Sequence, residues 1–170
     1  RLRHMLYTSY LFLVISLIVL LIWSPWAILG YRWQLKTTIF PSAYETLRNE
    51  LREKEYRGTV LVLPWHMYLQ CRFTPMARVL NPIGGMLAPI PLIFPDNIEM
   101  EWLSTNSVNP TSQKITQFLE THDRVILDAI GVDNILLMKH CADAVRYSWL
   151  RNVCDAKRET EEYVFYERSR

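Results

Sequence analysis

The chain has 170 residues with a formal net charge of +2, and half of its residues are hydrophobic. This length accommodates one domain of ordinary size. Residues 5–31 contain no Asp, Glu, Lys or Arg, so all 36 charged residues lie in the other 143 positions. That density of charge excludes disorder for the bulk of the chain. The uncharged stretch argues against a protein that is soluble along its whole length.

The positive net charge comes from the N-terminal end of the chain. Arg1, Arg3, Arg32 and Lys36 carry +4 without an acidic residue, which leaves 15 basic and 17 acidic residues from Thr37 onward. No basic stripe remains in that part, and we therefore expect no nucleic-acid partner. The chain opens with Arg1 rather than Met, and we expect it to be a piece of a longer protein.

The uncharged stretch predicts a transmembrane helix over residues 5–31. It exceeds the length of about 20 apolar residues that a bilayer-spanning helix needs. Leu11–Ile22 consists almost purely of Leu, Ile, Val and Phe, with Ser16 as the one polar residue, and aromatic residues stand near both ends of the stretch. A signal peptide would have a shorter apolar core and a small-residue cleavage site, and a buried core helix would contain more polar residues. We therefore predict a lipid bilayer as a partner. Cations flank the stretch on both sides, so its orientation stays open.

Residues 37–170 predict a small α/β domain with a mostly parallel sheet. Ser42–Glu45 has the sequence of a capping box, and apolar residues at helical spacing follow it. The run at residues 59–63 (TVLVL), which begins after Gly58 and ends before a proline, predicts a buried parallel strand.

Residues 64–110 predict a long, extended, apolar connection. Seven prolines in this segment exclude long regular elements and leave room only for short strands, at residues 78–80 and 91–94. A connection of this length is usually functional or packed on another part of the protein, here the membrane part.

Residues 109–112 predict the start of a helix. Gly131 suits the left-handed position just after the end of the next predicted helix. Further elements are expected as helices over residues 123–130 and 142–150 and as strands over residues 132–138 and 162–167. Alternating helices and strands predict a layered α/β fold.

Trp65, His66 and Tyr68 are the candidate substrate-binding residues. They directly follow the strand over residues 59–63, and in open α/β sheets ligands gather at the carboxyl ends of strands. Trp65 suits stacking on a sugar ring, and His66 suits hydrogen bonding or a role as a base. Both residues also have a purely structural interpretation. The Trp65 indole would be buried in the core, and the His66 imidazole would be hydrogen-bonded locally.

The sequence contains no signature of a metal or cofactor site. His122, His140 and Cys141 lack the paired spacings of zinc sites, and no phosphate-binding glycine loop is present. We therefore expect neither a metal nor a cofactor, and no catalytic residue is assigned. The three cysteines leave two interpretations open: one oxidised pair with a remaining thiol, or three buried thiols.

The order of motifs resembles the C-terminal extracytoplasmic region of large multi-pass bacterial membrane proteins that are grouped with C-type glycosyltransferases. The first match is Gly58–Tyr68 (GTVLVLPWHMY), and its most specific part is Val60–Tyr68. Weaker matches are Arg78–Pro82, Pro95–Asn97 and Ala129–Leu137. The chain departs from the family pattern at Gln70–Pro75 (QCRFTP), where a more polar aromatic loop is usual.

The resemblance implies a function in sugar transfer from a polyprenyl-phosphate-linked donor. The catalytic acidic residue of such proteins lies on an early outward loop, so this chain would be a non-catalytic accessory part or a cap that binds the acceptor. Its partners would be the lipid-linked sugar or glycan and the rest of the same polytopic chain. Its place would be the cell membrane, with the α/β domain outside the cytoplasm. The alternatives are a membrane-anchored interaction or scaffold module and the lid of a transporter-like protein.

Overall fold

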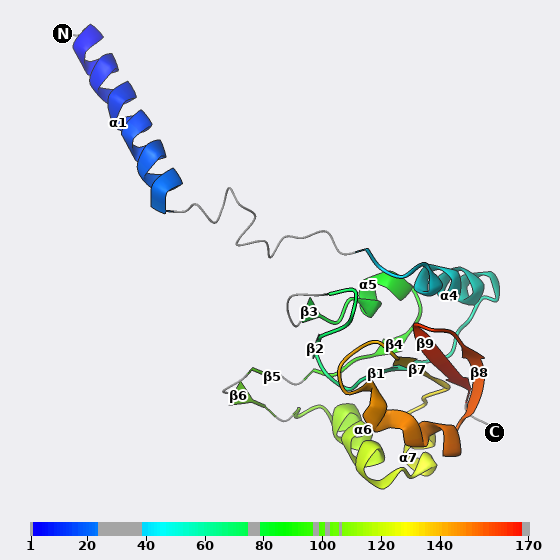
Figure 1. Ribbon diagram of the computed structural model, residues 1–170. Coiled ribbons are helices and arrows are strands. Elements are labelled where there is room, and N and C mark those ends of the chain that lie inside the picture. The colour runs from blue at the N-terminus through cyan, green and yellow to red at the C-terminus, as the bar shows by residue number, and fades with distance from the viewer. Residues whose placement is uncertain are drawn as a thin grey trace. The chain divides into compact units, whose positions relative to one another are not determined.

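The computed structural model describes residues 2–23, 39–74, 79–96, 99–100, 103–105 and 107–167. The chain divides into two units, residues 1–38 and residues 39–170. The first unit contains helix α1 (Leu2–Trp23), and the second contains an α/β domain with the other described elements (Figure 1).

The transmembrane helix predicted over residues 5–31 is wrong. In the described part of the chain, no helix combines the length and the apolar character that crossing a membrane requires. Helix α1 ends at Trp23, and residues 24–31 of the predicted span lie outside the described residues.

The α/β domain is built on a mixed sheet which, within the described residues, has five strands in the order β4-β1-β7-β9-β8. These strands are β4 (Leu92–Ile93), β1 (Val60–Leu63), β7 (Asn134–Met138), β9 (Tyr163–Glu167) and β8 (Asp155–Glu159). Strand β1 is parallel to both β4 and β7, whereas β9 is antiparallel to both β7 and β8. The prediction of a mostly parallel sheet is therefore wrong: β8 and β9 are joined by a short connection, which is compatible only with an antiparallel pair.

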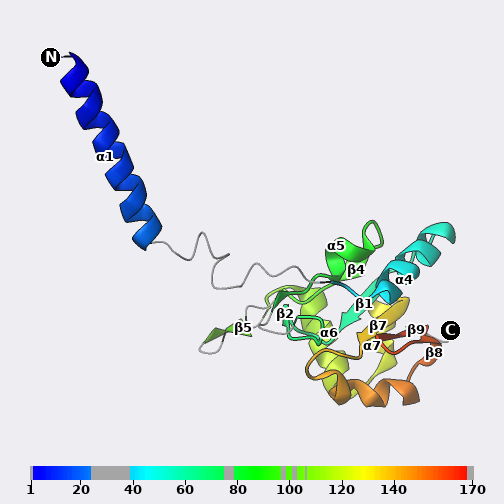
Figure 2. The ribbon, with the colours of Figure 1, turned by 45° about the horizontal axis from the view of Figure 1, so that its top comes forward.

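Helices cover both faces of this sheet (Figures 1 and 2). One face packs against α4 (Ser42–Glu53) and α5 (Ile83–Leu87), and the other against α6 (Pro110–Thr121), α7 (Arg124–Ala129) and the 3-10 helix η1 (Ala144–Asn152). The described short strands outside the sheet are β2 (Tyr68–Leu69) paired with β3 (Val79–Leu80), and β5 (Glu99–Met100) paired with β6 (Leu103–Ser104). The domain is thus a three-layer sandwich.

Strands β1 and β7 form the centre of the sandwich. All side chains of β1 and of β7 are buried, because helices lie over both faces of the sheet. Strand β8 differs: most of its side chains are exposed, and it lies at the edge of the sheet. Its sequence, DAKRE, carries the charges that protect an edge strand from pairing with other chains. The apolar periodicity that reveals a buried strand is absent there, and sequence analysis missed it for this reason.

The helix starts agree with the sequence in part. Asn109 and Asp123 cap α6 and α7, since their side chains accept hydrogen bonds from the backbone N–H groups two residues on, at 2.9 and 3.0 Å. The capping box expected at Ser42–Glu45 does not form. Pro41 occupies the N-cap position of α4 without a side-chain hydrogen bond, and Glu45 instead pairs with Arg48 at 3.2 Å.

Gly131 adopts the left-handed conformation expected of it, with φ of 71°. This conformation ends α7 and turns the chain toward β7.

The crossovers decide where the carboxyl ends of the parallel strands meet. The connection from β1 to β4 includes α5 on one face, and the connection from β4 to β7 includes α6 and α7 on the other. The carboxyl ends of β1, β4 and β7 consequently lie at one edge of the sheet. In open α/β folds, ligands bind outside such carboxyl ends.

Truncation of Leu61 is expected to destabilise the domain strongly. Its side chain is 0% exposed in β1, so Leu61→Ala should lower the free energy of unfolding by about 2–5 kcal/mol. Val125, which is 67% exposed on α7, provides the control: Val125→Ala should change it by less than about 0.5 kcal/mol. Urea unfolding followed by circular dichroism measures both. Equal effects of the two substitutions would contradict this placement of β1.

Candidate functional site at the carboxyl edge of the sheet

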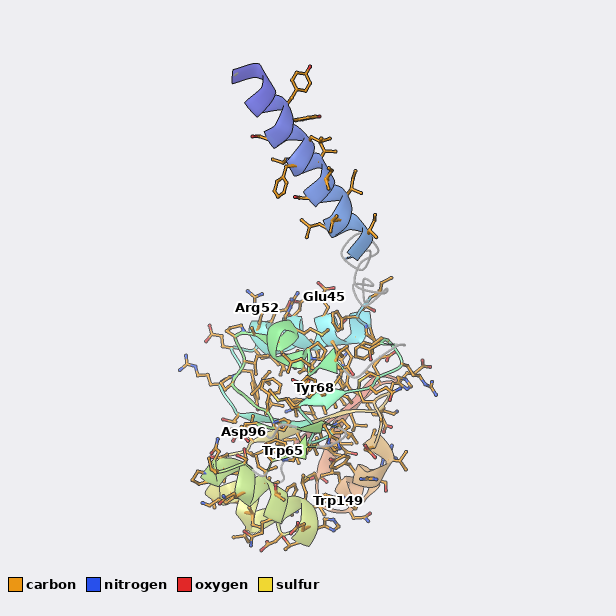
Figure 3. All side chains as sticks on the ribbon, turned by 90° about the vertical axis from the view of Figure 1, so that its left-hand side faces the viewer. Glu45, Arg52, Trp65, Tyr68, Asp96 and Trp149 are labelled. Atoms are coloured by element: carbon orange, nitrogen blue, oxygen red, sulfur yellow. A yellow bond between two sulfur atoms is a disulfide. The ribbon has the colours of Figure 1, made fainter. Side chains whose placement is uncertain are left out.

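The candidate site is built from the loops that follow β1, β4 and β7. Leu63 in β1 is aligned with Leu137 in β7, and Leu61 is aligned with Ile93 in β4, so the segments after these strands start at the same level. Figure 3 views the domain from this edge, and Trp65, Tyr68 and Asp96 lie there between the two helix layers. The sheet thereby gathers polar side chains from distant parts of the sequence.

A polar cluster of His66, Asp143 and Arg146 lies at this edge. The Asp143 carboxylate is 3.6 Å from Nε2 of His66 through one oxygen and 3.0 Å from Nε of Arg146 through the other. Asp143 has a φ of 66°, a left-handed conformation that Asp tolerates better than most residues. The side chains of His66 and Asp143 are 29% and 34% exposed, so a ligand in solvent has access to both.

Trp65 belongs to the core more than to this surface. Its side chain is 8% exposed and packs in the cluster that includes Leu63 and Tyr147. The backbone N–H of Trp65 donates a hydrogen bond of 3.0 Å to the Tyr147 hydroxyl, which fixes the start of the loop. Little of the indole remains for stacking on a sugar ring.

Tyr68 and His66 are more exposed to solvent than Trp65. Both residues are partly exposed, and Tyr68 lies in β2, where it is paired with Leu80 of β3. Of the three residues that the sequence predicts for this site, His66 lies beside a charged side chain, that of Asp143. Trp65 lies in the core, and Tyr68 lies on a short strand two residues after His66.

A disulfide between Cys71 and Cys141 joins the loops after β1 and β7. The backbone N–H of Ala142 also donates a hydrogen bond of 2.7 Å to the Gln70 carbonyl. These links lie close to Asp143 in the chain, so they hold the β7 loop beside the β1 loop. The pairing decides between the two interpretations of the cysteines: one pair is oxidised, and Cys154 is a buried cysteine outside it.

Asp96 follows β4 at the same edge and is linked to the start of α6. Hydrogen bonds hold its pKa below the ordinary value, with the Ser107 hydroxyl as the largest cause and with further contributions from Ser112 and Asn109, while partial desolvation opposes them. Ser112 is buried, at 3% exposure, so this contact ties the loop after β4 to the core.

Sequence analysis missed Asp143 and Arg146. Asp143 follows β7 as His66 follows β1, and the rule that ligands gather at carboxyl ends of strands applies to both strands. That rule, applied to the second buried strand, was the signal available for finding Asp143. The contact between Asp143 and His66 could not be predicted from the sequence, because 77 positions separate the two residues in the chain.

The chemistry of this edge suits polar binding. It offers a carboxylate that accepts hydrogen bonds, a guanidinium that donates them, and an imidazole that does either. In the described residues, no group of three or more His, Cys, Asp or Glu side chains is placed to hold a metal ion.

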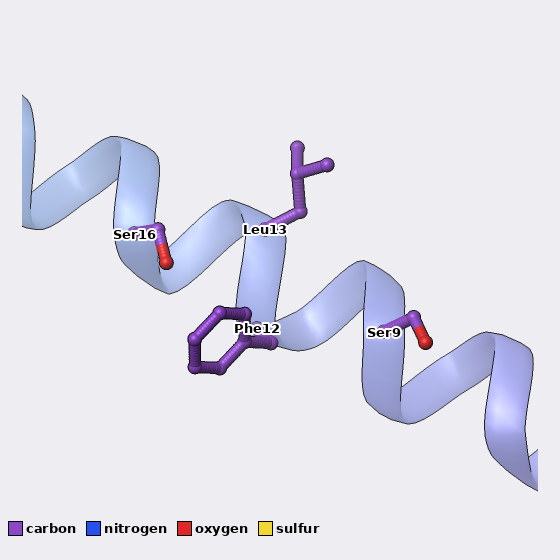
Figure 4. A pocket seen from close by; sticks show the side chains of 4 residues that line it. All are labelled: Ser9, Phe12, Leu13 and Ser16. Carbon is purple, nitrogen blue, oxygen red and sulfur yellow. The ribbon is translucent and has the colours of Figure 1, made fainter.

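A hollow of about 510 Å³ lies along α1 (Figure 4). Ser9, Phe12, Leu13 and Ser16 line it. These side chains all come from one helix and include no titratable group, so the hollow carries no chemistry.

Comparisons with known proteins leave the family open. No protein-family model, curated protein or solved structure matches the chain.

The disulfide predicts the thiol count and the stability of the chain. Under denaturing conditions a maleimide reagent should label one cysteine before reduction and three after it. Replacing Cys71 and Cys141 together by Ser should lower the free energy of unfolding by about 2–5 kcal/mol, because the unfolded chain loses a cross-link. Reductant should destabilise the unmodified chain and leave the double variant unchanged. Three labelled thiols in the oxidised protein would contradict the pairing.

The lowered pKa of Asp96 predicts a loss of stability in acid. The folded-state pKa lies below the unfolded-state value, so the ionised carboxylate stabilises the fold above the unfolded pKa. That contribution should be lost as the pH falls through the folded-state pKa, below about 4. Urea unfolding of the unmodified chain and of Asp96→Asn, across the acid range, measures it. The stability difference should shrink as the pH falls, and a difference that does not vary with pH would refute this role.

Proposed function

We propose that the α/β domain binds a sugar or glycan as a non-catalytic cap of a glycosyltransferase-like membrane protein. The observation that carries the proposal is the His66–Asp143–Arg146 cluster at the carboxyl edge of the sheet. The resemblance of Gly58–Tyr68 to C-type glycosyltransferases supports it independently. The acceptor would bind at this edge, and the donor would be a polyprenyl-phosphate-linked sugar handled by the rest of the same chain.

The cluster suits a ligand rich in hydroxyl groups. A sugar hydroxyl both donates and accepts hydrogen bonds, so it can donate to the Asp143 carboxylate and accept from the Arg146 guanidinium. Tyr68 adds an aromatic ring near His66 in the chain, and aromatic surfaces combined with a few placed polar groups are typical of small-molecule sites.

The disulfide supports a location outside the cytoplasm. Disulfides persist in oxidising compartments and are rare in the cytosol. The Cys71–Cys141 bond joins the loops that carry His66 and Asp143. The site would therefore be intact in an oxidising compartment, where this disulfide persists.

Helix α1 supports the lipid bilayer as a partner and the cell membrane as the location. Its residues from Leu11 to Ile22 are all apolar except Ser16. Burial of apolar surface is favourable by about 25 cal/mol per Å², so such a helix gains free energy against lipid or against the rest of the same chain.

Saccharide binding tests the proposed function. Saturation-transfer NMR with the full chain and a panel of monosaccharides and short oligosaccharides should identify a ligand. His66→Ala and Asp143→Asn should each weaken its binding at least about tenfold, equivalent to about 1.4 kcal/mol. Asp128→Asn, on α7, is the matched control for the loss of a carboxylate and should leave the affinity unchanged.

Two outcomes would reject the cap. One is full affinity in the His66 and Asp143 variants when circular dichroism shows that they are folded. The other is the absence of binding to every saccharide in the panel, which would favour the interaction or scaffold module.

A further inference from the structure

A polar pocket of about 350 Å³ lies at the amino edge of the sheet, where β1 and β7 begin. It is lined by Lys54, Glu55, Tyr56, Arg57, Gly58, Asp133, Asn134 and Glu167. Residues 54–58 connect α4 to β1, Asp133 and Asn134 enter β7, and Glu167 ends β9, where it is paired with Asn134. The pocket is therefore separate from the carboxyl edge that carries His66 and Asp143.

The pocket has a fixed polar base. Asn134 is 4% exposed, and its side-chain amide contacts the Tyr56 hydroxyl. The amide orientation that satisfies all its groups places the oxygen on that hydroxyl and the nitrogen on the carbonyls of Asp133 and Tyr166, at 3.3 and 3.2 Å. A buried amide paired on every side orders the residues around it.

Gly58 allows Tyr56 to reach this position. A Cβ atom at residue 58 would lie 2.3 Å from the Tyr56 hydroxyl oxygen and 3.0 Å from the Asp133 carboxylate. Any larger residue would therefore displace the tyrosine ring. Burial is the main cause that raises the pKa of Tyr56, so the hydroxyl stays protonated and donates to the Asn134 amide oxygen.

The charges of the lining residues are distributed unevenly. The loop after α4 brings Lys54 and Arg57 together with Glu55, which lies 3.9 Å from Arg57. The charged lining residues on the strand side are both carboxylates, Asp133 and Glu167. The loop side therefore carries net positive charge and the strand side net negative charge.

The strand-side carboxylates are held in place from outside the pocket. Asp133 accepts a hydrogen bond of 2.9 Å from the backbone N–H of Thr59, and Glu167 pairs with Lys157 of β8 at 2.8 Å. Glu167 is thus already paired with one cation, whereas the donor to Asp133 is an uncharged backbone group. A cationic group entering the pocket would meet oriented acceptors.

We propose that this pocket binds a small zwitterion with an ammonium and a carboxylate group, in the chemical class of free amino acids. The ammonium would lie against Asp133 and Glu167, and the carboxylate against Lys54 and Arg57, which is the charge complementarity that confers specificity. A neutral sugar would gain no ionic contact with the lining charges, which favours a ligand that carries both charges. The site is independent of saccharide binding at the carboxyl edge.

Binding of zwitterions and of their singly charged analogues tests the proposal. The full chain is titrated with glycine, L-alanine and γ-aminobutyrate, which differ in charge separation, and with propionate and ethylamine, which each carry one charge. NMR chemical shifts give both affinity and location. At least one zwitterion should bind saturably, with shifts at residues 54–58 and 133–134, and each singly charged analogue should bind at least about tenfold more weakly.

Charge-removing variants at the exposed rim make the test independent of folding. Lys54→Met and Glu167→Gln should each weaken zwitterion binding at least about fivefold, while Lys114→Met, an exposed lysine on α6, should leave it unchanged. The proposal fails if no zwitterion saturates below about 10 mM, if propionate or ethylamine binds as well, or if Lys54→Met binds like Lys114→Met. These outcomes do not bear on saccharide binding, because its variants lie at the other edge.

Discussion

Strands β1 and β7 run parallel, side by side, with all their side chains buried between two layers of helices. The architecture of the domain depends on this pair. Parallel neighbours cannot be joined by a hairpin, so the chain must cross over the sheet between them. The crossovers through α5, α6 and α7, together with α4 before β1 and η1 after β7, supply the layers that bury β1 and β7. Burial of the strand pair therefore depends on these helix layers.

The strand pair also creates two edges of different chemistry. At the carboxyl ends, the loops bring His66 to Asp143, and the Cys71–Cys141 disulfide holds these loops together. At the amino ends, the buried amide of Asn134 receives the Tyr56 hydroxyl and forms the base of a charged pocket. A change in the register of β1 against β7 would disturb both edges.

Much of the fold was predictable from local patterns. The apolar run at residues 59–63 and the one at residues 132–138 became β1 and β7, and Asn109 and Gly131 took their expected roles at helix ends. Prediction failed where the apolar pattern was weak, and where hydropathy was the only criterion used. The charged edge strand β8 lacks apolar alternation. Hydropathy over residues 5–31 predicted a transmembrane helix, but none of the described helices is long and apolar enough for one.

The candidate site was predictable only in part. The sequence locates the end of a strand, but it does not show which residues from other segments lie beside that end. The sequence by itself determined the local elements: buried strands from continuous apolar runs, helix starts from Asn and Asp caps, and His66 after a strand. Only the tertiary structure decided which residues meet. Cys71 and Cys141 are 70 positions apart, and Tyr56 and Asn134 are 78 apart. Contacts at such separations depend on strand order and crossover, because local periodicity carries no information about which strand lies beside which.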